Sequence, residues 1–177
     1  MRFLCKKIAR SLAGLHLPRY QELPQMGLYL EQTATYINEA LAPLENVHLT
    51  SSMVSNYVKH DLIASPKKKL YSRQQIAELV FIAVSKNVLS LADLCEALKL
   101  QRSNYDTETA YNYMVDELEN VLAYVFGFKG ELTDVGHEHG EYEYGEYKTM
   151  LRNVIMTVSY KVYLDKYFAQ FTGQEEE

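Results

Sequence analysis

The residues best suited to chemistry in this chain are polar and basic side chains of the kind that contact nucleic acid. Between residues 49 and 63, the sequence LTSSMVSNYVKHDLI predicts a short helix whose inward face is Met53, Val54 and Tyr57. The same spacing turns a polar set outward: Ser52, Ser55, Asn56, Lys59 and His60. On such a face an asparagine forms two hydrogen bonds with adenine, and a lysine reaches guanine or phosphate. The alternative for Asn56 is an ordinary surface or capping asparagine.

A basic segment follows this helix. Lys67, Lys68 and Lys69 are consecutive in a short extended piece, in which Pro66 prevents a helix, and Arg73 comes shortly afterwards. Each phosphate that such cations neutralise releases counterions, which favours DNA binding. The charge distribution agrees, since residues 1–105 carry a balance of +5 and residues 106–177 one of −10. Outside this context, three lysines would be read as a solvated loop.

Apolar residues at helical spacing predict the elements that position these side chains. The expected helices cover about residues 28–41, 51–60, 72–86, a stretch opening at 90, 107–126 and 146–171. Thr50 or Ser51 is expected to cap the second, and Ser72 with Gln75 fits a capping box for the third. The last helix is apolar on several faces, which predicts that it is central or covered by a partner chain.

The order of these elements resembles the winged helix-turn-helix of MerR-type regulators over residues 28–98. The matching parts are Asp61-Leu62-Ile63 at the helix end, the basic residues 66–70 as a wing, and Tyr71-Ser72-Arg73-Gln74-Gln75-Ile76 at the next helix start. Asp61 stands where a glycine is usual, which is tolerable because aspartate visits the left-handed region. Many MerR-type proteins carry an Arg-Tyr-Tyr run where this chain has Ser55, Asn56 and Tyr57.

A closer resemblance is to a bacterial family, the domain of unknown function numbered 1836. It is carried by Leu23-Pro24, Leu28-Tyr29, the stretch from Leu49 to Tyr57, and the stretch from Lys68 to Arg73. That family has no established activity, so it implies a fold class and no mechanism.

Together these observations predict a mainly α fold. We expect a basic N-terminal segment (1–23), a MerR-like winged helix-turn-helix domain (24–103) and an acidic, aromatic-rich helical region (104–177) that mediates dimerisation. The hypothesis is a cytoplasmic bacterial transcription regulator that binds double-stranded DNA as a homodimer at a near-palindromic site. The alternative is a protein-interaction module that keeps the fold without DNA affinity. The acidic second half and the missing arginine favour that alternative.

Other functional classes find little support in the sequence. Glycine-rich phosphate loops and nucleophile motifs are absent, so no enzyme activity and no cofactor are expected. Cys5 and Cys95 form no paired motif, which suits a reducing cytosol. The histidines of His137-Glu138-His139 are too close together for a typical metal site and favour an acidic loop. No apolar stretch approaches a membrane span.

Two features leave alternatives open. Residues 1–15 mix lysines and arginines with apolar residues, which indicates an amphipathic helix or a mobile arm in place of a signal peptide. The acidic half holds nine of the fifteen tyrosines, Tyr142 and Tyr144 among them. These aromatics could line a pocket for a cationic or amphipathic effector, although tyrosines at helical spacing more often form core or an oligomer interface.

Overall fold

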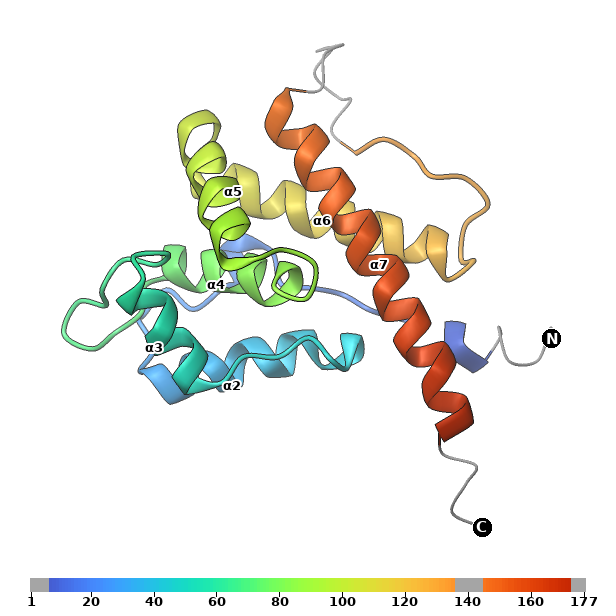
Figure 1. The fold of residues 1–177 in the computed structure, drawn as a ribbon, viewed down its shortest axis with the longest axis horizontal. Coiled ribbons are helices and arrows are strands. Elements are labelled where there is room, and N and C mark those ends of the chain that lie inside the picture. Colours follow the sequence, from blue (N-terminus) through green and yellow to red (C-terminus); the bar gives the residue numbers. More distant parts are fainter. Residues whose placement is uncertain (1–6, 136–144, 173–177) are drawn as a thin grey trace.

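Every regular element in the described part of the chain is helical. The computed structural model describes residues 7–135 and 145–172 (Figure 1). The elements, in order, are the 3₁₀ helix η1 (Tyr20–Glu22), α2 (Leu30–Leu41), the 3₁₀ helix η2 (Ala42–Leu44), α3 (Ser51–Lys59), α4 (Arg73–Ser85), α5 (Leu91–Asn104), α6 (Thr107–Val125) and α7 (Glu146–Thr172). The mainly α prediction is confirmed, and the predicted helices correspond to α2–α7 with closely matching boundaries.

The segment after α3 is a tight turn without the two-stranded wing that the MerR resemblance implied. Among residues 7–135 and 145–172, β pairing is limited to isolated antiparallel bridges, Lys67 with Leu70 and Leu28 with Tyr71. The first part of the connection is used by the reversal after α3, where Leu62 and Ile63 are buried in the core. Pro66 then removes a backbone donor, and the chain closes a tight turn at residues 67–70 directly afterwards. A winged fold is therefore not supported here.

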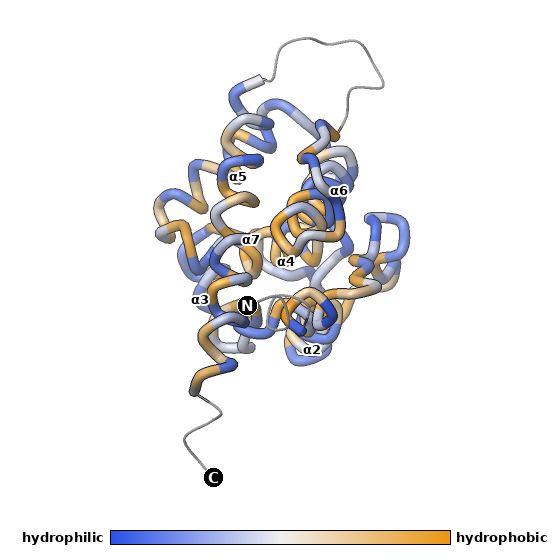
Figure 2. Tube along the Cα trace, turned by 90° about the vertical axis from the view of Figure 1, so that its right-hand side faces the viewer, coloured by the Kyte–Doolittle hydropathy of each residue, from blue (hydrophilic) through white to orange (hydrophobic). Residues whose placement is uncertain are grey.

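Helix α4 occupies the centre of the molecule. All eleven residues from Gln75 to Ser85 are buried, because α2, α5, α6 and α7 pack around this helix. In Figure 2 the tube of α4 is largely orange and lies among the other helices. The predicted apolar stripe is buried, but so are the remaining faces, including the polar Glu78. The central helix is thus α4, whereas α7 lies across α6 on the outside (Figure 1).

The described part of the N-terminal segment packs onto α6. Residues 7–10 are helical, and Ile8, Leu12 and Leu17 are buried in the main hydrophobic cluster. Glu119 of α6 accepts hydrogen bonds from the Leu17 amide (2.7 Å) and from both terminal nitrogens of Arg19 (3.0 and 2.7 Å). The helix of residues 7–10 lies within the segment for which the sequence offered an amphipathic helix, and Ile8 and Leu12 bury its apolar side.

Some sequence predictions fall outside the described residues. His137-Glu138-His139, Tyr142 and Tyr144 lie in the stretch 136–144, and Cys5 lies before residue 7. Residues 127–135 contain no regular element and turn back beside α6, where the Asn120 side chain donates to the Thr133 carbonyl (2.8 Å). In the described residues no helix combines the length and apolarity that crossing a bilayer requires.

Candidate nucleic-acid interface

Helix α3 divides into a buried face and a polar exposed face. Val54 and Tyr57 are buried and Met53 is half-buried against the core, as the spacing predicted. The outward positions are all exposed, namely Ser52, Ser55, Asn56, Lys59 and His60. The structure therefore places these five predicted side chains together on one open helix face.

The orientation of α3 is set by contacts at its N-terminal end. Thr50 caps the helix, since its hydroxyl oxygen accepts a hydrogen bond from the Met53 amide (3.1 Å). In addition, the Asn38 side chain of α2 donates to the Leu49 carbonyl (2.8 Å) and accepts from the Leu49 amide (2.7 Å). This pair holds the chain entering α3 against α2, so the position of α3 is fixed relative to α2.

The C-terminal end of α3 reverses through a left-handed residue. Asp61 has a φ of 55°, which confirms the expectation for this position. Both the Leu62 and Ile63 amides then donate to the Tyr57 carbonyl, and the two side chains are fully buried. The reversal therefore anchors the chain in the core immediately after the exposed helix face.

A tight turn carries the three consecutive lysines, and we name residues 67–70 the lysine turn. Its closing hydrogen bond runs from the Leu70 amide to the Lys67 carbonyl (2.9 Å). The two central residues, Lys68 and Lys69, have positive φ values of 52° and 66°. This conformation favours glycine or asparagine, and each bulky residue held there stores of order 1 kcal/mol of strain. Such strain is often found at functional sites.

The lysine turn is fastened to the segment that precedes α2. Leu28 and Tyr71 exchange two backbone hydrogen bonds, of 3.0 and 2.8 Å. A Cβ on the neighbouring Gly27 would lie 2.8 Å from the Leu70 Cβ, so only glycine permits this close approach. The lysines thus project from a base that is anchored on both sides.

Arg73 does not join the exposed basic set. Its Nε donates to the Leu23 carbonyl (3.1 Å), one Nη donates to Gln21 (3.2 Å), and its guanidinium lies over the Tyr20 ring (5.5 Å). Its other Nη is buried. The sequence assigned Arg73 to a phosphate, whereas in the structure it ties η1 to the start of α4.

The remaining basic side chains at this end have no intramolecular carboxylate partner among the described residues. The lysine ion pairs of the described chain lie elsewhere, at Lys99–Glu96, Lys161–Asp165 and Lys166–Glu45. Burial raises the pKa values of Tyr57 and Tyr71, so these phenols add no negative charge beneath the site. The four lysines at positions 59, 67, 68 and 69 are therefore free to meet an external anion.

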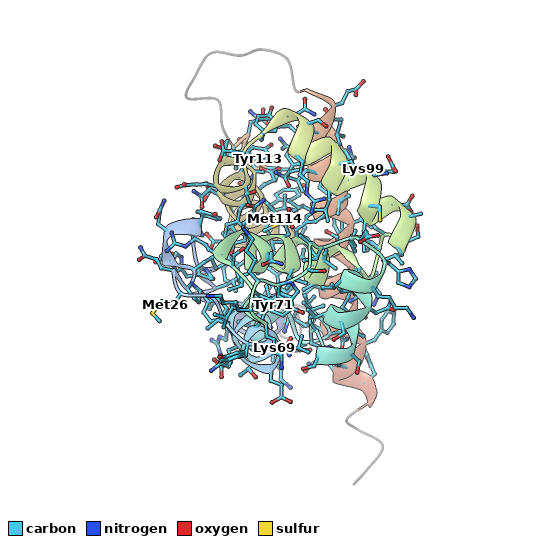
Figure 3. All side chains as sticks on the ribbon, turned by 90° about the vertical axis from the view of Figure 1, so that its left-hand side faces the viewer. Met26, Lys69, Tyr71, Lys99, Tyr113 and Met114 are labelled. Atoms are coloured by element: carbon cyan, nitrogen blue, oxygen red, sulfur yellow. The ribbon has the colours of Figure 1, made fainter. Side chains whose placement is uncertain are left out.

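Helix α3 and the lysine turn lie at the same end of the molecule. Both are at the left of Figure 1, and Figure 3, which faces that end, shows Lys69 far from the Lys99 that pairs on α5. Met26 (84% exposed) and Tyr29 (55% exposed) belong to the segment that bridges to the turn. Sequence reasoning missed these two, as well as Asn38 and Gly27, because their roles depend on contacts distant in sequence.

The fold and site define an α-helical protein in which the polar face of α3 and the lysine turn lie at one end of the molecule. A family model described as a domain of unknown function (DUF1836) matches residues 18–114, more than half of the chain. The chain belongs to this family. The matched stretch contains η1, α2, α3, the lysine turn, α4 and α5, and it ends within α6. No curated protein and no solved structure matches the chain.

Proposed function

We propose that this protein binds double-stranded DNA as a sequence-specific transcription regulator, with a MerR-like helix-turn-helix reduced to a turn in place of the wing. The observation that carries the proposal is the open face of α3, which includes Lys59, at the same end of the molecule as the three lysines of the lysine turn (Figure 1). An α-helix with its side chains is about 10–12 Å across, which fits a major groove about 12 Å wide, and the nine residues of α3 would extend about 14 Å along it.

Under this proposal the two parts of the site have different tasks. The α3 face presents Ser55, Asn56 and Lys59 to base edges, where each good bidentate contact contributes about 1–3 kcal/mol of discrimination. The lysine turn contacts the phosphate backbone, which adds affinity without sequence preference. Arg73 is left out of the DNA contact because its guanidinium is engaged within the protein.

A binding experiment with pooled genomic DNA fragments tests the proposal. The protein is titrated at several salt concentrations, and the fragments that it retains are sequenced. We expect one recurring motif and a steep salt dependence. Lys68→Ala combined with Lys69→Ala should weaken binding to all fragments, whereas Asn56→Ala should relax the preference at one base position. Lys99→Ala is the matched control, because Lys99 is exposed but paired with Glu96 away from the site.

A protein-interaction role is the second candidate, and the exposed Met26 and Tyr29 beside the lysine turn favour it. Apolar side chains of this size are typical anchors for a protein partner. Retention on a heparin column separates the two candidates. Elution at salt well above that expected for the pI of 5.6 supports DNA binding, and failure to bind favours a protein partner.

A further inference from the structure

The C-terminal half of α7 carries an apolar stripe that the molecule leaves uncovered. Its members are Tyr160 (46% exposed), Leu164 (47%), Phe168 (59%) and Phe171 (49%), and we name them the α7 stripe. Their spacings of four, four and three residues place them on one side of the helix. The opposite side, including Val158 and Val162, is buried against the body. The stripe is therefore additional to the surface that holds α7 in the fold.

This end of α7 projects beyond the neighbouring helices. Figure 1 shows the red end of α7 passing clear of α6, and Figure 2 shows apolar segments on the projecting end. Aromatic rings on the helix contact one another along this end, with the Tyr167 ring 5.4 Å from Phe168 and 5.3 Å from Phe171. These contacts hold the rings in place but leave about half of each stripe side chain exposed.

No charged side chain belongs to the α7 stripe. The charges beside it are paired on the same helix, where Lys161 contacts both oxygens of Asp165 at 2.5 and 2.7 Å. Lys166 points the other way and binds Glu45 at 2.5 Å. A second apolar surface could therefore cover the stripe without leaving a buried charge unpaired, which would be costly.

We propose that the α7 stripe is a homodimer interface in which α7 of a second copy lies antiparallel to it. Tyr160 and Phe168 are each four residues from Leu164, so a twofold axis at Leu164 places Tyr160 of one copy against Phe168 of the other. The exposed face continues through Thr157 and Asn153, so the positions from 153 to 171 are separated by three or four residues, the spacings found along the contact of paired helices. An antiparallel pair also opposes the two helix dipoles.

The area of the stripe suits a weak, self-complementary dimer. Four side chains, each about half exposed, offer roughly 100 Å² apiece, or about 400 Å² per copy. Since apolar atoms make up about 60% of a typical interface, the whole contact would bury about 1,300 Å². That lies at the lower end of the range for specific interfaces, so dissociation in the micromolar range is expected. The proposal does not depend on DNA binding.

Sedimentation velocity of the full chain over a range of concentrations, without DNA, tests the dimer. We expect dimer at tens of micromolar, and monomer for Leu164→Asp with Phe168→Asp at the same concentration. Met26→Asp, a change of another exposed apolar residue away from α7, should remain dimeric (Figure 3). Circular dichroism of each variant checks that the helices persist. A monomeric wild type, or a variant that folds and still dimerises, would overturn the proposal.

Cysteine cross-linking tests the direction of the helices, in a background with Cys5→Ser and Cys95→Ser. Leu164→Cys should form a disulfide between copies under mild oxidation. Tyr160→Cys alone should not, but a mixture of Tyr160→Cys and Phe168→Cys chains should. Strong cross-linking of Tyr160→Cys with itself would indicate parallel helices and refute the antiparallel arrangement.

Discussion

Replacing the two central residues of the lysine turn by glycine should stabilise the fold while weakening DNA binding. Lys68 and Lys69 have positive φ values, which cost about 1–2 kcal/mol each for residues with a side chain. Glycine removes this cost but loses about 0.5–1 kcal/mol through its greater freedom in the unfolded chain. The net gain is about 0.5 kcal/mol per position, or about 1 kcal/mol for Lys68→Gly with Lys69→Gly. For a chain of this size that corresponds to a rise in Tm of about 2–4 °C.

The same double variant loses two cations from the proposed phosphate contact. Each phosphate contact contributes about 0.9 to the slope of log affinity against log salt, so the slope should fall by about 2. Because phosphate contacts are not sequence-specific, affinity should fall on cognate and random DNA alike. Stability and DNA affinity are therefore expected to move in opposite directions.

Thermal unfolding followed by circular dichroism measures the effect on stability. Fluorescence anisotropy with labelled DNA at several salt concentrations measures the effect on DNA binding. Lys68→Arg with Lys69→Arg is the control, since it retains both charges and the strained backbone and should change neither value. A lower Tm for the glycine variant would refute the reasoning from backbone strain. An unchanged salt slope would refute the assignment of the lysine turn to phosphate.

Three further variants test contacts that hold the site and the N-terminal segment in place. Asn38→Ala removes both hydrogen bonds to Leu49, so chemical denaturation should show a loss of about 1–3 kcal/mol and DNA binding should weaken. Gly27→Ala places a Cβ against Leu70, and its Tm should fall by an amount equivalent to about 1–3 kcal/mol; an unchanged Tm would show that the turn can shift. Burial opposes ionisation of Glu119, but hydrogen bonds from its arginine and amide partners outweigh it and hold the pKa below its usual value. Glu119→Gln should therefore be less stable than wild type above about pH 4.5, and denaturation at lower pH should show the difference shrinking as the wild-type carboxylate protonates through its lowered pKa.

The sequence predicted those features that depend on local spacing. Met53, Val54 and Tyr57 recur at helical intervals, so the exposed face of α3 followed directly from them. Asp61 occupies the position just after the helix, where a left-handed residue is common, and its φ agrees. These predictions needed only neighbours within one or two helical turns.

The features that the sequence could not predict depend on distant contacts. Gln75 and Glu78 make α4 appear half-exposed, yet both are buried because other helices cover them. Arg73 lies in a basic stretch, and nothing local signals that residues about 50 positions earlier bind its guanidinium. The wing was expected from resemblance alone, and the connection between α3 and α4 forms a tight turn with only isolated bridges.

The packing of α6 has a consequence for what can fold by itself. The family match ends at Met114, but the same helix continues to Val125, and its fully buried Val115, Leu118 and Val121 pack in the core that joins α4 and α7. A chain cut at the end of the match would leave half of α6 without its hydrogen-bonded continuation and uncover part of the central helix. The stretch that matches the family model is therefore shorter than the part of the chain that shares one hydrophobic core. A fragment containing only the matched stretch would be expected to aggregate.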